Sequence, residues 1–184
     1  MENAPARSAA VLVSYAARRL ACDTFLEEHG ITNMNDHTFI PPRLAEIAAD
    51  FGAASREEKL ELLLEFSDQL PPLPPELRDH RGMEQVHECM SPVFVIAQRD
   101  GDQIVYHIDV PPEAPTIRGF AAILREGMNG LTPAQALAVS SDFIQQMGLH
   151  QVLSPQRLNG IGALLVYMKR QALRLLEQEP AGTA

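Results

Sequence analysis

The chain has 184 residues, enough for one folded domain with an additional segment, since domains usually contain about 100–200 residues. Hydrophobic residues make up 46% and charged residues 21% of the chain, a composition that excludes disorder throughout its length. The 24 acidic residues outnumber the 15 basic ones and give a formal charge of -9, which argues against binding to nucleic acid or to an acidic membrane surface.

The cysteine content and the start of the chain indicate a cytoplasmic protein. Only Cys22 and Cys89 are present, far apart, which differs from the dense cysteine pattern of a small secreted domain. The first residues, Met1-Glu2-Asn3, lack the basic start of a secretory signal, and Asp23, Glu27 and Glu28 argue against a transit peptide. No stretch approaches the roughly 20 apolar residues of a membrane span. We therefore expect a cytoplasmic protein without a membrane partner.

The beginning of the chain reads as a separate segment. Residues 8–28 carry apolar side chains at helical spacing and predict an amphipathic helix. Cys22 lies on the apolar face of that helix, where packing alone explains it. A polar break follows and contains Met34, which we take as an alternative start. The sequence therefore divides into an N-terminal extension at 1–33, without an assigned role, and a domain at 34–184.

Two helices are predicted at the start of this domain. The first begins at Pro42 and is expected to end at Gly52. Ser55 and Glu58 have the spacing of a capping box, which predicts a second helix that ends before the prolines at 71–75, themselves expected to be extended. The side chains expected in the core are Leu44, Ile47, Ala48 and Phe51 from the first helix and Leu60, Leu63, Leu64 and Phe66 to Leu70 from the second.

A small sheet is predicted next. Residues 92–98 and 104–110 are rich in Val, Ile, Phe and Tyr, and the Asp-Gly pair between them is a strong hairpin signal. Residues 83–87 add a third strand. The helices expected after the sheet are 116–127, one from the Thr132 capping box, 141–147 before Gly148, and one from Ser154 to about Gln178. The grouped strands predict an α+β fold, with an antiparallel sheet of about three strands flanked by N-terminal helices and a C-terminal helical half.

Cys89 is the strongest candidate for a reactive residue. It lies in a polar loop between two predicted strands, a kind of position where functional groups are often placed. A free cysteine taken at random is more often a small packing residue. The polar neighbours of Cys89 and the Ser-Pro pair after it favour the reactive reading, whereas Cys22 needs no role beyond packing.

Two other readings of this loop use histidine. A thiol hydrolase would pair Cys89 with His87, His107 or His150 as the base, although the sequence does not show such a geometry. A zinc site would combine Cys89 and His87 with scattered histidines such as His80. Structural zinc sites usually show two tightly spaced ligand pairs, so we predict no metal.

Arg157 is the second informative residue. Ser154 and Pro155 predict a helix start, which places the Arg157 charge in the first helical turn. The N-terminus of a helix already carries about half a positive charge, so a cation there calls for an anion nearby. That anion is either a carboxylate such as Glu113, or a group on a partner or a reacting sulfur.

The order of four motifs resembles the SufE/CsdE family, over about residues 42–176. They are the helix at 58–70, VHECMSPVF at 86–94, EAPTIRGF at 113–120 and LSPQRLNG at 153–160. The resemblance implies a sulfur carrier and desulfurase activator rather than a free-standing enzyme. Its cysteine accepts sulfane sulfur, as a persulfide, from a SufS-like cysteine desulfurase. It then delivers the sulfur to a SufBCD-like scaffold complex for iron–sulfur cluster assembly.

By the matching motif, the acceptor is Cys89. The resemblance implies no cofactor on this chain, and it places pyridoxal phosphate on the partner desulfurase. Many members of the family have Gly before the cysteine and Gln after it, whereas this chain has Glu88 and Met90. The residues that the resemblance marks as supports or partner contacts are Arg157, Arg118, Gly119, Glu113, Glu88 and Met90.

A sulfur carrier must be reactive when it meets its donor and quiet at other times. Burial raises the pKa of a thiol and keeps it protonated. We therefore hypothesise two states of the loop at 87–92, one with Cys89 tucked against apolar residues such as Phe94 or Met90 and one extended on the donor. An acidic interaction module with a packed cysteine is the remaining alternative.

Overall fold

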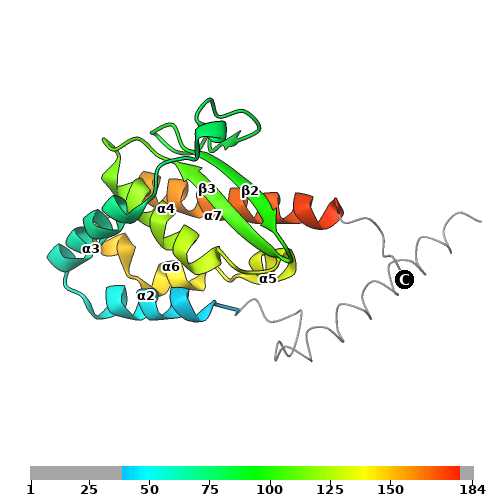
Figure 1. Cartoon of the computed structure of the whole chain (residues 1–184). Helices are drawn as coiled ribbons and strands as arrows, with labels where there is room; N and C mark the ends of the chain where they lie inside the picture. The colour runs from blue at the N-terminus through cyan, green and yellow to red at the C-terminus, as the bar shows by residue number, and fades with distance from the viewer. Residues whose placement is uncertain (1–38, 179–184) are drawn as a thin grey trace, which may run out of the picture. The chain divides into compact units, whose positions relative to one another are not determined.

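A three-stranded antiparallel sheet organises the part of the chain that the structure, a computed structural model, describes: residues 39–178 (Figure 1). The predicted helix at 8–28, Cys22 and Met34 lie outside these residues, and the division at residue 33 stays a prediction. The elements are α2 Pro42–Ala53, α3 Arg56–Gln69, η1 Pro75–Leu77, β1 Glu84–Gln85, β2 Phe94–Asp100, β3 Gln103–Asp109, α4 Pro115–Met128, α5 Pro133–Ala138, α6 Asp142–Gln146, η2 Leu149–Gln151 and α7 Pro155–Glu177. The expected α+β fold is confirmed.

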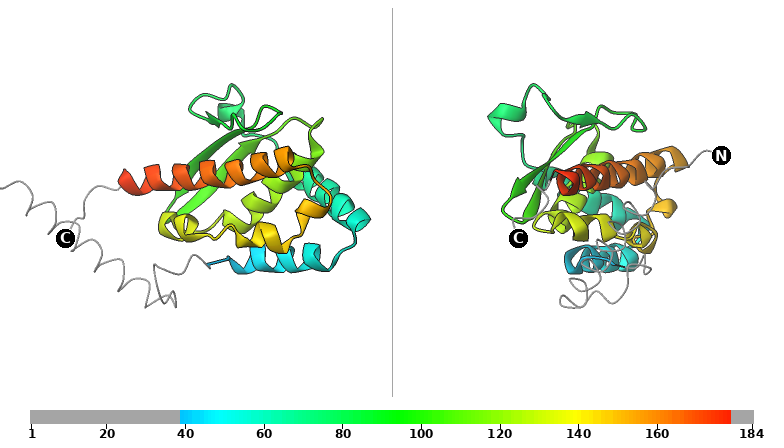
Figure 2. Two further views of the ribbon diagram at one scale, coloured as in Figure 1. Left: turned by 180° about the vertical axis from the view of Figure 1, so that it is seen from behind. Right: turned by 90° about the vertical axis from the view of Figure 1, so that its right-hand side faces the viewer.

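The sheet has the order β1-β2-β3 and buries one of its faces. Val95 pairs with Ile108 and Ala97 with Tyr106, and these side chains alternate with less buried ones, as in an antiparallel sheet covered on one side. The Tyr106 hydroxyl donates a hydrogen bond to the Met168 carbonyl of α7, 3.1 Å away. Figure 2 shows α7 lying along the sheet.

The hairpin turn is tighter than the sequence indicates. Strand pairing continues to Asp100 and Gln103, so only Gly101 and Asp102 lie in the turn. Gly101 has a φ of 61°, which glycine adopts without the strain of a side chain. The predicted third strand is present as β1, but only Glu84 and Gln85 belong to it.

Helix α2 buries the four predicted residues but does not end at Gly52. Gly52 lies inside the helix, where an added Cβ would come within 3.0 Å of the Gln146 carbonyl oxygen. This glycine permits a close approach between two segments and is not a stop signal. The prolines at 71–74 are not helical, as expected, whereas Pro75 begins the short helix η1.

The buried face of α3 also differs from the prediction. The Ser55 capping box is present, but Leu60 and Leu64 are 43% and 51% exposed. Leu63 and Ser67 are buried as predicted, and Lys59, which was not predicted, is buried with them; the spacing of four residues places all three on one helical face. The Lys59 ammonium donates a hydrogen bond to a backbone carbonyl 2.5 Å away, which offsets the cost of burying its charge.

Two neighbouring residues of α4 determine how α3 packs. A Cβ at Gly119 would overlap the Leu63 carbonyl, so only glycine permits this contact between the helices. Arg118 links α4 to the end of α3 through hydrogen bonds from its guanidinium. It donates hydrogen bonds to the carbonyls of Ser67 at 3.0 Å, Leu70 at 2.9 Å and Val110 at 2.6 Å. Arg118 therefore joins the last turn of α3 to the residue after β3.

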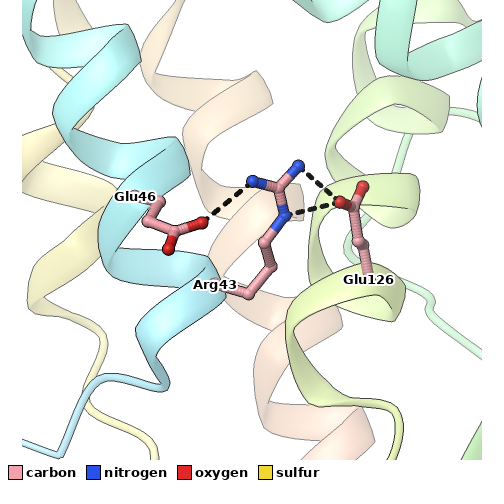
Figure 3. A network of polar contacts seen from close by, with 3 residues as sticks. All are labelled: Arg43, Glu46 and Glu126. Carbon is pink, nitrogen blue, oxygen red and sulfur yellow. Dashed lines mark hydrogen bonds and ion pairs between the residues drawn. The ribbon is translucent and has the colours of Figure 1, made fainter.

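A surface network joins α2 to α4. The Arg43 guanidinium contacts Glu46 at 3.1 Å within α2 and Glu126 at 2.6 Å on α4 (Figure 3). These side chains are largely solvent-exposed, and such pairs usually contribute at most about 1 kcal/mol. The buried residues around Phe51 therefore hold α2 more firmly than this network does.

Replacing Arg118 by alanine leaves three carbonyls without their donor and is expected to lower the free energy of unfolding by about 2–3 kcal/mol. Urea denaturation followed by circular dichroism measures this as a lower midpoint with an unchanged slope. Arg78→Ala is the matched control, because Arg78 is exposed and its side chain has no partner among residues 39–178. Equal midpoints for the two variants would contradict this account.

Candidate functional site

Cys89 lies on a short loop whose two ends are held by strand pairing. β1 pairs with the start of β2, and the Val86 amide donates a hydrogen bond to the Val93 carbonyl at 2.9 Å. Val86 and Val93 are both buried. Within the loop, the Cys89 amide donates to the Val86 carbonyl at 3.3 Å. Residues 87–92 therefore form a compact turn that presents Cys89.

The sulfur of Cys89 rests against the backbone of α7. Its thiol donates a hydrogen bond to the Gly160 carbonyl, with 3.6 Å between Sγ and O. A Cβ at Gly160 would lie 3.1 Å from Sγ, which is tighter than an ordinary contact. We call this arrangement, the Gly160 backbone facing Cys89 Sγ, the sulfur seat.

The half-buried position of Cys89 keeps its thiol protonated. Burial, followed by the negative charge of Glu88, raises the pKa of the thiol from 9.0 to about 11. At pH 7 a thiol with that pKa is ionised in about one molecule in ten thousand, against a few per cent for an ordinary cysteine. In this conformation Cys89 is therefore a poor nucleophile.

A pocket of about 380 Å³ opens beside the sulfur. Three segments that are distant in sequence line it: the Cys89 loop, the start of α4 and the first turns of α7. The lining residues are Cys89, Met90, Ser91, Glu113, Ala114, Pro115, Thr116, Ile117, Gln156, Arg157, Gly160 and Ile161. The structure thus brings together four predicted site residues, namely Cys89, Met90, Glu113 and Arg157.

Arg157 carries a positive charge at the mouth of this pocket. Its amide is capped by the Ser154 hydroxyl at 3.4 Å, as the sequence predicts, and its side chain is exposed. Glu113 lines the same pocket but forms no ion pair with Arg157, so the simple explanation of a carboxylate neighbour does not hold in this structure. Within residues 39–178, the Arg157 guanidinium has no hydrogen-bonding or ionic partner. The pocket therefore offers a free cation near the sulfur.

The other predicted residues lie around this site in different ways. Arg118 and Gly119 do not line the pocket and instead hold α4 against α3. Met90 is 77% exposed, while Phe94 stacks on the His80 ring with 4.0 Å between centroids. The Cys89 thiol therefore contacts the backbone of Gly160 in α7, whereas the sequence predicts that it rests against Phe94 or Met90.

The histidines predicted as alternative bases lie elsewhere. None of them lines the pocket, and His107 instead contacts the Gln98 side chain at 3.1 Å. His87 and His150 are exposed.

Among the described residues there is no cluster of three or more His, Cys, Asp or Glu side chains that could hold a metal ion. None of the helices that the structure describes is long and apolar enough to cross a membrane.

Gly160 is the contact that the sequence did not single out. It lies within the LSPQRLNG motif, but nothing in the local pattern shows which residue it faces. The sequence offers one indication that Gly160 has a special role: glycine inside a helix costs about 1 kcal/mol relative to alanine. This cost alone does not separate Gly160, which faces Cys89, from Gly162, where an added Cβ would meet nothing within 4 Å.

Comparison with known proteins identifies the family. Residues 45–172 match the family model "SufE: Fe-S metabolism associated domain". An uncharacterised SufE-like protein of Mycobacterium tuberculosis is 43% identical over 133 residues, which cover 72% of this chain and 92% of the relative. The "Cysteine desulfuration protein SufE" of Plasmodium vivax is 26% identical over 84% of this chain and 59% of its own length.

The chain is also similar to a solved structure. The solution structure of a hypothetical protein from Thermus thermophilus has a TM-score of 0.67 and 35% identity, and covers 76% of this chain and 100% of that one. The chain belongs to the SufE family, as the four sequence motifs predicted.

The raised pKa of Cys89 predicts a slow reaction with iodoacetamide at neutral pH. In a Cys22→Ser background, where Cys89 is the only thiol, the folded protein at pH 8 is expected to react about a hundredfold more slowly than the protein unfolded in urea. The rate should still be rising at pH 10 and level off only above pH 11. A folded-state midpoint near pH 8.5, as for an ordinary thiol, would show that the sulfur seat does not hold the proton.

Proposed function

We propose that this protein carries sulfur from a cysteine desulfurase to iron–sulfur cluster assembly, with Cys89 as the carrier residue. One observation supports this most directly: a SufE-family chain places Cys89 on a pinned loop at a pocket with an unpaired arginine. Cys89 is the one free cysteine among residues 39–178. Its loop departs from the usual family pattern at Glu88 and Met90, the residues on either side of Cys89 in the chain, and both are exposed.

The transfer proceeds as a thiol exchange. The Cys89 thiolate attacks the outer sulfur of a persulfide on the donor enzyme, a new S–S bond forms on Cys89, and the donor cysteine leaves as a thiolate. The Cys89 proton passes to solvent or to the leaving thiolate, so no external oxidant or reductant is required. The pyridoxal phosphate that generates the donor persulfide belongs to the desulfurase, and this chain supplies no cofactor of its own.

The sulfur seat implies that the reaction needs a second conformation. In the seat the thiol is protonated, and the attack requires a thiolate. Outward movement of residues 87–92 would remove the burial that raises the pKa and bring Cys89 toward the donor. A partner that binds the outward state more tightly shifts the population toward it. Stimulation of the desulfurase then follows, because an acceptor removes the sulfur from its active site.

Arg157 is suited to stabilise sulfur anions at this site. Arg157 lines the same pocket as Cys89, and its guanidinium lacks a carboxylate partner among the described residues. A cation close to a thiolate or persulfide lowers the free energy of the charged form. Glu113, at the same pocket, offers the opposite charge to a basic group on a partner.

The thiol hydrolase receives less support from this site. Such an enzyme needs a base within hydrogen-bond reach of its nucleophile, and no histidine among residues 39–178 lines the pocket. The acidic interaction module does not account for a pocket that opens on the sulfur. We therefore retain the sulfur carrier as the function, with a SufBCD-like scaffold as the receiving partner and the cytoplasm as its compartment.

Incubation with a pyridoxal-phosphate cysteine desulfurase and cysteine should increase the intact mass of the protein by one sulfur atom. The Cys89→Ser variant should show no gain, because it lacks the acceptor thiol, whereas Cys22→Ser should gain the sulfur as the wild type does. Mass spectrometry after removal of free persulfide measures both. A gain that persists in Cys89→Ser, or its absence in the wild type, would contradict the proposed function.

Loss of the Arg157 charge should slow the transfer. Arg157→Ala is expected to reduce the initial rate of sulfur loading about tenfold, which corresponds to roughly 1.4 kcal/mol for one charge-assisted contact. Arg157→Lys should recover part of the rate, since it keeps a positive charge without the planar fork. The neighbouring Gln156→Ala, also at the pocket, serves as the control and should load almost normally. Equal loading rates for Arg157→Ala and Gln156→Ala would exclude this role of Arg157.

A further inference from the structure

Two glycines in α7 differ sharply in what surrounds them. An added Cβ at Gly160 would meet Cys89 Sγ at 3.1 Å and Cys89 Cα at 3.6 Å. At Gly162 an added Cβ would meet nothing within 4 Å. Glycine destabilises the interior of a helix by about 1 kcal/mol relative to alanine. At Gly160 the loop of Cys89 explains why a side chain is excluded, and at Gly162 nothing in the described structure does.

The carbonyl of Gly160 distinguishes the two charge states of the sulfur. It accepts a hydrogen bond from the Cys89 thiol, and its direction is fixed because it belongs to the regular backbone of α7. A thiolate has no proton to donate and would face the negative end of the carbonyl dipole. The same contact that stabilises the thiol therefore destabilises the thiolate.

The sulfur seat also has no room for a loaded sulfur. A persulfide adds a second sulfur at about 2.05 Å from Sγ. Only 3.6 Å separates Sγ from the Gly160 oxygen, so an added sulfur directed at that oxygen would overlap it. The outer sulfur of a loaded Cys89 must turn into the pocket or leave the seat with the loop. The contact between Sγ and the Gly160 oxygen therefore leaves no space for a second sulfur between these two atoms.

We infer that Gly160 is a positioning residue of the sulfur carrier: its bare backbone lets α7 hold the unloaded, protonated Cys89 in the sulfur seat, and a side chain at position 160 displaces the thiol from it. This inference rests on the proposed function for the meaning of loading, but the seat itself exists without a donor. The charged groups near the sulfur are Glu88 on the loop, Glu113 before α4 and Arg157 on α7. None of them replaces the contact with the Gly160 backbone.

The test compares Gly160→Ala with Gly162→Ala, both in a Cys22→Ser background. Each change adds one methyl group to α7 and favours the helix to a similar extent, but only the first presses on the sulfur. The rate of iodoacetamide reaction with Cys89 is measured from pH 6 to above pH 11. Gly160→Ala should move the midpoint to lower pH and raise the rate at pH 8 at least about tenfold. Gly162→Ala should match the parent protein.

The result that overturns the inference is a Gly160→Ala profile equal to that of Gly162→Ala. If Gly160→Ala does not fold, the double variant Gly160→Ala with Cys89→Ala decides, because it removes the sulfur that the new methyl group meets. Recovery of folding in the double variant supports the seat, and continued failure overturns it. Thermal unfolding followed by circular dichroism gives this result.

The alkylation experiment contains no desulfurase, so it separates this inference from the proposed function. A shifted profile for Gly160→Ala together with no sulfur gain in the wild type would leave the seat intact and remove the sulfur carrier. An unshifted profile for Gly160→Ala together with a normal sulfur gain at Cys89 would contradict the role of Gly160 and leave the sulfur carrier intact. Each proposal therefore fails on its own measurement.

Discussion

The contact between the Cys89 sulfur and the Gly160 backbone is the interaction on which the functional account depends. It requires that a loop and a helix from distant parts of the chain keep a fixed separation. Glu84 of β1 helps to fix this separation, because its carboxylate contacts two side chains of α7, Gln171 at 2.9 Å and Arg174 at 3.0 Å. The strand that precedes the loop is thereby fastened to the helix that carries the sulfur seat.

A carrier of reactive sulfur has to combine protection with access. The sulfur seat protects by keeping the thiol half-buried and protonated, and the pocket beside it leaves one side open. The loop that holds Cys89 has few internal bonds beyond its pinned ends, so moving it outward does not require the sheet to unpair. The rigid elements provide the geometry, while residues 87–92 provide the change of state.

Most of the elements could be predicted because their ends are marked by local chemistry. Ser55, Thr132 and Ser154 each cap a helix through their own hydroxyl, an interaction that needs no knowledge of the rest of the fold. Contacts between elements could not be predicted in this way. The face that α3 buries depends on where α4 approaches it. Gly160 looks like any helical glycine until Cys89, 71 residues earlier, is placed against it.

The most direct test is the distance between Cys89 Sγ and the Gly160 oxygen in a crystal structure of this protein bound to a cysteine desulfurase. The account predicts that the sulfur has left the 3.6 Å contact and points into the partner, while the three Arg118 hydrogen bonds remain unchanged. A fully docked complex in which the sulfur still rests on Gly160 would contradict the central claim.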